Sequence, residues 1–365
     1  MYQTEIIPVY RPSLSDLERK YLLDAFDSTW ISSSGSYLER FEAEFARFSG
    51  VSEAIMVSNG TVALHLALVA LGVGPGDEVI VPSFTYIASV NCIRYVGATP
   101  VFVDIDPNTW AISPNTIQDK ISSRTKCILA VHLYGIPADL LGIKKLCEKY
   151  SISLVEDCAE ALGAKILDRH VGAFGDIATF SFFGNKTLTT GEGGAVVTNK
   201  QDLADKVRLL KGQGQSLSRR YYHEVVGYNY RMTNLAAAIG LGQLEKIDAI
   251  LQRKKQIFKT YNNVVAKLGL RRQNLLEGHI QGFWLYSFLA KNERERSELT
   301  NFLSEYGIET RPVFLLAHTM PMYSEELNLP VSKEISDCGL SLPSFPDLND
   351  NEVSKICQAL EDFYK

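Results

Sequence analysis

The sequence predicts an α/β fold in which a mostly parallel sheet is covered by helices on both faces. From about residue 51, short apolar segments alternate with segments of helical periodicity. The apolar segments are rich in Val and Ile and do not alternate with polar residues, as expected for strands that are buried on both faces. Alternation of this kind is typical of parallel strands joined by crossover helices.

The expected elements follow a regular order along the chain. Strands are predicted at residues 53–57, 77–82, 99–106, 126–135, 152–159, 178–184 and 193–199. Helices are predicted between them at residues 61–72, 85–97 and 139–150. The pattern then changes, because residues 234–269 form one long helical stretch.

The region after this long stretch mixes helices and strands. We expect a strand at 283–290, a helix at 293–307, an extended backbone in IETRPVF and a final amphipathic helix from about Asn351. A chain of 365 residues is too long for one average core. We therefore expect a large domain over residues 1–245 and a smaller α+β domain over residues 246–365.

Composition limits the partners. The chain is 46% hydrophobic and 22% charged with a net charge of -5, so it has no basic footprint and nucleic acid is not expected as a partner. The N-terminus does not have the pattern of a signal peptide, and no apolar run approaches a membrane span. The six cysteines are scattered, which indicates reduced thiols and a cytoplasmic location. The six histidines lack short ligand spacing, so no metal is expected.

A lysine stands at the end of a predicted buried strand. In SFFGNKTLTTGEGG, residues 181–194, Lys186 follows an aromatic strand and precedes small and glycine-rich residues. Burial lowers the pKa of a lysine amine, and the neutral amine can form an imine with an aldehyde cofactor. A solvated loop lysine is the alternative that this stretch alone leaves open.

An aspartate ends another predicted strand. Asp157 lies in VEDCAE, residues 155–160, where a carboxylate is costly unless it meets a cation. A pyridinium nitrogen is such a cation, and an acidic partner keeps it protonated so that the ring can accept electrons. The alternative is an aspartate that caps the following helix.

The turn SNGT, residues 58–61, joins a strand to a long apolar helix. Gly60 and Thr61 place free backbone amides at the helix N-terminus, which is a favourable site for a phosphate group. Many such turns bind no ligand, so the turn alone is weak evidence. The order of phosphate turn, aspartate and lysine is the order that a doubly wound domain binding pyridoxal phosphate (PLP) requires.

With these residues the sequence resembles the sugar aminotransferases of the DegT/DnrJ/EryC1/StrS family, which belong to the aspartate-aminotransferase (fold type I) superfamily. The resemblance runs from about Ile7 to the C-terminus. It is carried by residues 23–42, 81–91, 131–135, 180–194, 227–245 and 310–323. It implies an aspartate-aminotransferase-like fold with PLP as the cofactor.

The resemblance also implies residue roles. Lys186 would form the Schiff base with the cofactor, Asp157 would pair with the pyridine nitrogen, and Tyr86 would stack on the ring. Glu160 would lie near the phenolic oxygen, at a position that is glutamine or histidine in other members. The phosphate would be held by Gly60, Thr61, Ser181 and, from the neighbouring subunit of a homodimer, Asn229.

The implied reaction transfers an amino group from L-glutamate to a keto-sugar nucleotide in two half-reactions. Within the family, the similarity favours amination at C4 of GDP-4-keto-6-deoxy-D-mannose, a step toward O-antigen polysaccharide, and a dTDP- or UDP-linked 4-keto sugar is the alternative. Candidate substrate contacts are Tyr10, Trp30, Ser32, His223, Arg311 and His318. A further candidate for the diphosphate is the cluster Lys211, Arg219 and Arg220, with a solvated loop as the alternative.

Three other functions fit less well. Sugar dehydratases on the same fold carry histidine at the position of Lys186. A non-catalytic regulator would need a DNA-binding module, for which the chain has neither a basic segment nor a spare domain. A nicotinamide-dependent oxidoreductase would need its spaced glycines after a strand and before a helix, whereas GVGPGDEV, residues 72–79, has the opposite order.

Overall fold

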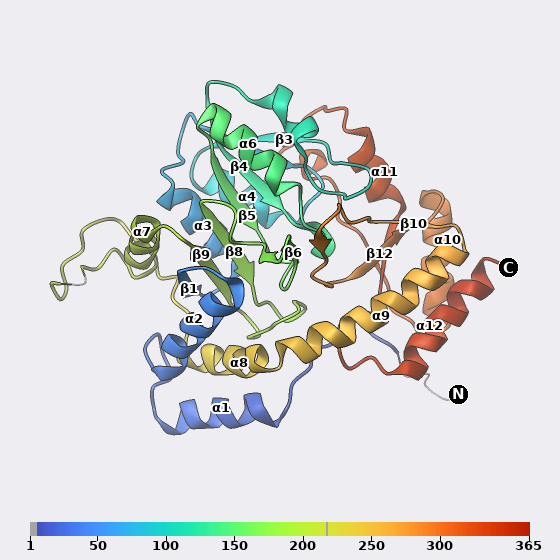
Figure 1. Cartoon of the computed structure of the whole chain (residues 1–365), viewed down its shortest axis with the longest axis horizontal. Helices are drawn as coiled ribbons and strands as arrows, with labels where there is room; N and C mark the ends of the chain where they lie inside the picture. Colours follow the sequence, from blue (N-terminus) through green and yellow to red (C-terminus); the bar gives the residue numbers. More distant parts are fainter. Residues whose placement is uncertain (1–5, 217) are drawn as a thin grey trace.

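The computed structural model describes residues 6–216 and 218–365 and has a seven-stranded sheet at its centre (Figure 1). In order across the sheet, the strands are β1 (Glu53–Val57), β9 (Gly194–Thr198), β8 (Ile177–Ser181), β5 (Ser153–Asp157), β4 (Thr125–Val131), β2 (Glu78–Pro82) and β3 (Thr99–Val103). Six of these strands run in one direction, and β9 is antiparallel to both of its neighbours. The predicted mostly parallel sheet is confirmed.

Helices cover the sheet on both faces. As a result, every residue of β2 and of β9 is buried. Five helices each come after a strand of this sheet in the sequence: α3 (Gly60–Ala70), α4 (Ala88–Tyr95), α5 (Pro114–Ile117), α6 (Leu140–Tyr150) and α7 (Gln201–Lys211). Helix α3 packs against β8 and β9, and α6 packs against β5. These connections place the carboxyl ends of the parallel strands at one edge, where ligands bind in open α/β sheets.

Two helices that the sequence reading did not assign precede the sheet. Helix α1 (Asp16–Asp27) begins with a capping box formed by Ser15 and Glu18. Helix α2 (Ser36–Ser49) buries Phe41 and Phe45 against the ring of Phe182, with centroid distances of 5.5 and 5.2 Å. Both helices also contact α8 (Asn234–Glu245). A helix that comes after the large sheet in the sequence therefore packs against the two helices that precede it.

The stretch predicted as one long helix is two helices. Helix α8 ends at Glu245, and α9 (Ile247–Lys267) begins after Lys246, whose φ of -110° and ψ of 12° interrupt the helix. The side chain of Lys246 turns back to the start of α1, where its Nζ lies 2.6 Å from Glu18 Oε1. The prediction of a continuous helix over residues 234–269 is therefore wrong at this residue.

A second, smaller set of elements follows the break. Its four-stranded sheet contains β10 (Arg271–Arg272), β12 (Tyr286–Leu289), β14 (Gly339–Leu342) and β13 (Arg311–Pro312). Its helices are α9, α10 (Glu293–Glu305), α11 (Pro330–Cys338) and α12 (Asp350–Phe363). A short three-stranded sheet, formed by β11 (His279–Ile280), β6 (Lys165–Ile166) and β7 (Arg169–His170), joins the later part of the chain to the earlier part.

The buried apolar residues form two clusters. Helix α8 contributes Ala237 and Leu241 to the larger cluster around the seven-stranded sheet, whereas α9 contributes Phe258 and Tyr261 to the smaller one. Ile7 also belongs to the smaller cluster, so this early residue packs with the later part of the chain. We propose that the domain boundary predicted near residue 245 lies at the break between α8 and α9.

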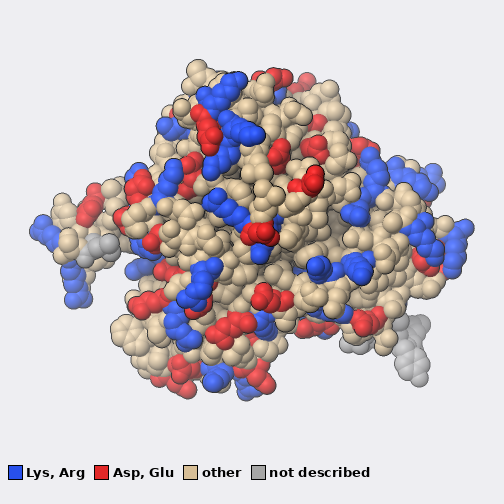
Figure 2. Space-filling model, in the orientation of Figure 1, with Lys and Arg blue, Asp and Glu red and all other residues tan. Residues whose placement is uncertain are grey.

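The surface mixes both signs of charge. On the face in Figure 2, Lys and Arg side chains alternate with Asp and Glu side chains, as expected for a net charge of -5. Across residues 6–216 and 218–365, no helix combines the length and the apolar character that crossing a bilayer requires.

Candidate active site

A cavity of about 630 Å³ opens at the carboxyl edge of the large sheet. Its wall includes Asp157 at the end of β5, Ser181 at the end of β8, and Lys186 in the loop that follows. The second set of elements closes it with Trp284, next to β12, and Arg311 of β13. The structure therefore brings the phosphate turn, Asp157 and Lys186 to one site, together with residues of the second set of elements.

Asp157 is held by two hydrogen bonds at the floor of the cavity. Its Oδ2 accepts from the hydroxyl of Ser89 in α4 at 2.7 Å, and its Oδ1 accepts from the backbone N–H of Ala159 at 3.0 Å. The side chain is buried, with 4% of the residue exposed. A fixed, buried carboxylate is suited to pair with a cationic ring nitrogen.

The amine of Lys186 lies between a carboxylate and an aromatic face. Its Nζ is 3.6 Å from Glu160 Oε1 and 4.0 Å from the centroid of the Trp284 ring. Burial lowers the pKa of Lys186, while Glu160 and then Asp157 act in the opposite direction. A buried lysine with a lowered pKa is more readily available as a nucleophile and as a base.

Glu160 is the partner of this lysine. Burial raises its pKa to about 7, against the opposing effect of Lys186. Its Oε2 accepts a hydrogen bond from the backbone N–H of Tyr134 at 2.9 Å, which fixes the carboxyl group. Lys186 and Glu160 are therefore a coupled pair, in which the protonation of one group depends on that of the other.

The phosphate-binding features lie at the start of α3. Asn59 caps this helix by accepting from Val62 N at 3.0 Å, and Gly60 is the first helical residue. A Cβ on Gly60 would lie only 2.8 Å from the Cβ of Ser181, so glycine is required for this close approach. The result is a small concave surface of backbone amides and a serine hydroxyl at a helix N-terminus, which favours an anion.

Tyr86 completes the set predicted to contact the cofactor ring. It lines the cavity and is 58% exposed, with its ring 5.9 Å from that of Phe314. The cavity thus offers a partner to each part of pyridoxal phosphate. The anion-binding start of α3 suits its phosphate, the lysine suits its aldehyde, and the buried acid and the aromatic side chain suit its ring. The residues present therefore fit this cofactor.

Only some of the predicted substrate contacts line the cavity. Arg311 lines the cavity. Tyr10 lies behind the lysine, because its hydroxyl donates to the main-chain oxygen of Lys186 at 2.6 Å. His318 is buried outside the lining of this cavity, with its Nδ1 2.6 Å from the Oγ of Ser83.

Four more predicted residues lie outside the lining of the cavity: Trp30, Ser32, His223 and Asn229. Trp30 and Ser32 are exposed in the loop between α1 and α2. His223 and Asn229 are exposed in the segment between α7 and α8, which we call the extended segment (residues 212–216 and 218–233) because it reaches away from the body in Figure 1.

The three residues predicted to contact a diphosphate, Lys211, Arg219 and Arg220, lie in two different environments. Lys211 is half-buried, and its Nζ contacts Glu42 Oε1 at 3.1 Å and the main-chain oxygen of Met56 at 2.9 Å. Lys211 therefore ends a helix and is paired within the protein, so the solvated-loop interpretation is wrong for it, while a contact with a diphosphate stays a prediction. Arg219 and Arg220 lie in the extended segment and are exposed.

Ser89, Tyr134 and Trp284 are among the side chains of the site that were not anticipated from the sequence. Ser89 is 68 residues from Asp157 along the chain, so no local pattern links them. Tyr134 lies in the predicted strand 126–135, but its φ of 54° directs the chain into a turn after β4. The Trp in FWLYSFLA, residues 283–290, was assigned to a strand, and only the fold places it beside the lysine.

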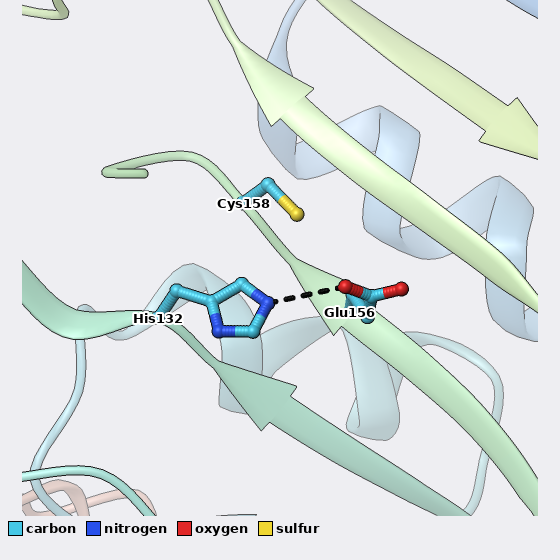
Figure 3. A group of neighbouring side chains, drawn as sticks. All are labelled: His132, Glu156 and Cys158. Carbon is cyan, nitrogen blue, oxygen red and sulfur yellow. Dashed lines mark hydrogen bonds and ion pairs between the residues drawn. The ribbon is translucent and has the colours of Figure 1, made fainter. Parts of the chain in front are cut away.

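A second buried group lies behind the floor of the site (Figure 3). The Nδ1 of His132 accepts from Ala138 N at 3.0 Å, so Nε2 carries the proton that faces Glu156 at 3.3 Å. Glu156 also accepts from the backbone N–H groups of the loop 172–175, at 2.6 to 2.8 Å. With Cys158 these residues have metal-ligand chemistry, but hydrogen bonds within the protein already occupy the nitrogen and carboxylate atoms.

The fold and the cavity together define a class of enzyme, the PLP-dependent aminotransferases of the aspartate-aminotransferase type. More closely, the chain belongs to the DegT/DnrJ/EryC1/StrS aminotransferase family, whose model matches residues 12–361. The predicted family and fold are confirmed.

Individual relatives agree with this assignment. The chain is 51% identical to a GDP-perosamine synthase of Escherichia coli O157:H7, over 98% of each chain. It is 48% identical to a GDP-perosamine synthase of Vibrio cholerae, over 98% of this chain and 99% of the relative. Its structure resembles the PLP form of the putative sugar aminotransferase Spr1654 from Streptococcus pneumoniae, with a TM-score of 0.94, 28% identity and 98% of each chain covered.

Proposed function

We propose that the chain transfers an amino group from L-glutamate to C4 of GDP-4-keto-6-deoxy-D-mannose and so produces GDP-perosamine. The observation that carries the aminotransfer is the contact of the buried Lys186 amine with Glu160, beside Asp157, in one cavity. The choice of sugar is supported by the names of relatives that match 98% of the chain at 51% and 48% identity.

Each residue of the site has a role in this proposal. When bound, PLP supplies a conjugated ring that takes up the electrons released at the α-carbon of the donor. Asp157 holds a proton at the ring nitrogen, and Ser89 holds Asp157 in place. The Nζ of Lys186 removes the proton from the α-carbon and holds it as an ammonium group beside Glu160. Tyr86 limits the position of the ring from the cavity wall.

Anionic groups need separate sites. The start of α3, with Gly60, Thr61 and Ser181, would hold the phosphate of the cofactor. Arg311 is the cationic side chain that accompanies Lys186 in the described lining, and it is 4.0 Å from Glu309. Its guanidinium group is suited to a carboxylate of the donor or to the diphosphate of the sugar nucleotide.

We also propose a homodimer in which each copy completes the site of the other. Asn229 lies outside the cavity of its own chain, in the extended segment. The same segment exposes Tyr221 and Val226, at 78% and 90%, and a second copy of the chain would cover them. In this arrangement Asn229 reaches the phosphate site of the neighbour, and Trp30, Ser32 and His223 are available to its substrate.

A cytoplasmic location is consistent with this function. The six cysteines are free thiols, five of them buried, as is usual for proteins in a reducing compartment.

The test compares three sugar nucleotides. Purified enzyme with PLP and L-glutamate is incubated separately with the GDP-, dTDP- and UDP-linked 4-keto-6-deoxy sugars, and kcat/KM is measured for each. We expect the GDP sugar to give the highest value. A clear preference for a dTDP or UDP sugar would overturn the substrate and leave the aminotransferase in place, whereas dehydration without amination would overturn the reaction.

A further inference from the structure

The face of Trp284 lies against the reacting atom of the proposed chemistry. The Nζ of Lys186 is 4.0 Å from the centroid of the indole ring, and Glu160 Oε1 approaches the same atom at 3.6 Å. The three residues come from different parts of the fold: Lys186 follows β8, Glu160 follows β5, and Trp284 precedes β12 of the second sheet. An amine at this position is therefore enclosed by both sets of elements.

The indole ring is held in a fixed orientation. Its Nε1 donates to the main-chain oxygen of Asn185 at 2.8 Å, so the residue next to the lysine orients the ring that the lysine touches. Behind it, Tyr134 stacks at 5.6 Å with an interplanar angle of 28°, and Phe314 at 6.3 Å with an angle of 23°. Only 3% of Trp284 is exposed. The face seen by Lys186 is thus presented by a rigid aromatic stack.

The indole face can stabilise the protonated form of Lys186 that the proposed reaction requires. Burial favours the neutral amine of Lys186, but the proposed reaction requires the same amine to carry a proton between two steps. An indole face attracts an ammonium ion, and it does so most strongly where water is excluded. The titratable groups that act on Lys186 are Glu160 and Asp157, both acidic, so the aromatic face adds an uncharged stabiliser to two carboxyl groups.

We propose that Trp284 is a catalytic residue whose indole face, together with Glu160, holds the ammonium form of Lys186 while that amine carries the proton taken from the amino donor. The proposal rests on the aminotransferase function proposed above. It adds a residue of the cavity lining that contacts the reacting atom of the lysine. It also explains why an aromatic residue, and not an aliphatic one, stands where the second sheet meets the lysine.

A structural role and a catalytic role make opposite predictions for the lysine. If Trp284 only fills space, Trp284→Leu opens a gap beside Lys186, and water that enters the gap makes the ammonium more stable. If the π face holds the ammonium, Trp284→Leu removes an attraction and makes the ammonium less stable. The pKa of the free Lys186 amine should therefore rise in the first case and fall in the second.

The experiment measures this pKa directly. Wild type, Trp284→Phe and Trp284→Leu are loaded with pyridoxamine phosphate, so that Lys186 is a free amine, and are labelled with trace acetic anhydride over a range of pH. Mass spectrometry of the peptide that contains Lys186 gives the midpoint of labelling. We expect a fall of about one pH unit for Leu and a smaller fall for Phe, because the indole is the strongest π face.

A matched control separates this effect from the loss of a buried tryptophan. Trp110 is 1% exposed and packs edge-on against Tyr134 at 6.3 Å, with Tyr134 between it and Trp284. Trp110→Leu should lower stability and leave the labelling midpoint of Lys186 unchanged. The pH profile of the first half-reaction, followed by its change in absorption, should move in the same direction as the labelling in the Trp284 variants.

The outcomes are distinct. An unchanged or raised midpoint in Trp284→Leu overturns the proposal, and so does a shift of equal size in the Trp110 control. If the Leu variant does not fold, Trp284→Phe decides by the same measure, and a wild-type midpoint there overturns the proposal. A wild-type protein that forms no borohydride-reducible bond to PLP refutes the proposed function itself, which is a separate result.

Discussion

The hydroxyl of Ser89 donates a hydrogen bond to the carboxylate of Asp157 at 2.7 Å, in a part of the cavity floor where both residues are buried. This bond joins α4, which follows β2, to the end of β5, and it leaves Asp157 in one orientation. Since Asp157 is the residue proposed to hold the ring nitrogen protonated, Ser89 acts on the site by positioning Asp157.

Removal of this bond should weaken the enzyme and preserve its fold. In Ser89→Ala we expect kcat to fall about ten- to a hundredfold, because a hydrogen bond to a charged group contributes about 1.5–3 kcal/mol. Ser89→Thr can keep the bond and should retain more activity. Steady-state kinetics with L-glutamate checks the prediction, and an Ala variant with wild-type kcat would remove Ser89 from the account.

Glu160 should give the reaction a titration near neutral pH. Its pKa is raised to about 7, so it ionises as the pH rises through that value and then stabilises the ammonium form of Lys186. We expect Glu160→Gln to remain an aminotransferase, because an amide oxygen can still accept from Tyr134 N, and to lose this inflection. The pH profile of kcat is the measurement. A variant profile that superimposes on that of wild type would contradict the coupling of the two residues.

Lys254 of α9 should make the protein less stable at low pH. Its side chain is fully buried with one hydrogen bond, from Nζ to the main-chain oxygen of Ser344 at 2.5 Å, and burial lowers its pKa from 10.5 to about 7. The unfolded state therefore binds more protons between these two values, so stability rises with pH across this window, and below about pH 7 the full cost is present. That cost is on the order of 5 kcal/mol.

We expect Lys254→Met to be more stable than wild type at pH 6 and this advantage to narrow by roughly half at pH 9. Urea unfolding at both values gives the free energies. Lys255→Met is the matched control, because Lys255 is exposed on the same helix, and its effect should not depend on pH. A constant difference between Lys254→Met and wild type would show that Lys254 is charged in the folded protein at both values.

The proposed dimer predicts complementation between inactive variants. Lys186→Ala and Asn229→Ala would damage different chains of the same site, so one site of a mixed dimer carries both changes and the other carries neither. Co-refolded mixtures should regain activity that neither parent has. Mixtures no more active than their parents would place Asn229 outside the neighbour's site.

Much of this architecture follows from local patterns. The seven-stranded sheet was predicted because buried parallel strands are apolar without alternation, and the order of Gly60, Asp157 and Lys186 placed the chemistry at strand ends. The break at Lys246 was missed because both flanking helices are regular and the interruption is fixed by a contact with Glu18, far away in the sequence.

Long-range contacts account for the rest. Ser89, Tyr134 and Trp284 enter the site through packing between elements, which no window of sequence contains. Lys211 was misread because its local context is polar, whereas its partner, Glu42, lies on α2.

The central claim is that Lys186 is the residue that bonds the cofactor. The most direct measurement is peptide mass spectrometry after the protein has been mixed with PLP, reduced with borohydride and digested. The account predicts a pyridoxyl-phosphate adduct on the peptide that contains Lys186, which Lys186→Ala lacks. An unmodified Lys186 peptide, or an adduct on another lysine of the wild-type chain, would contradict it.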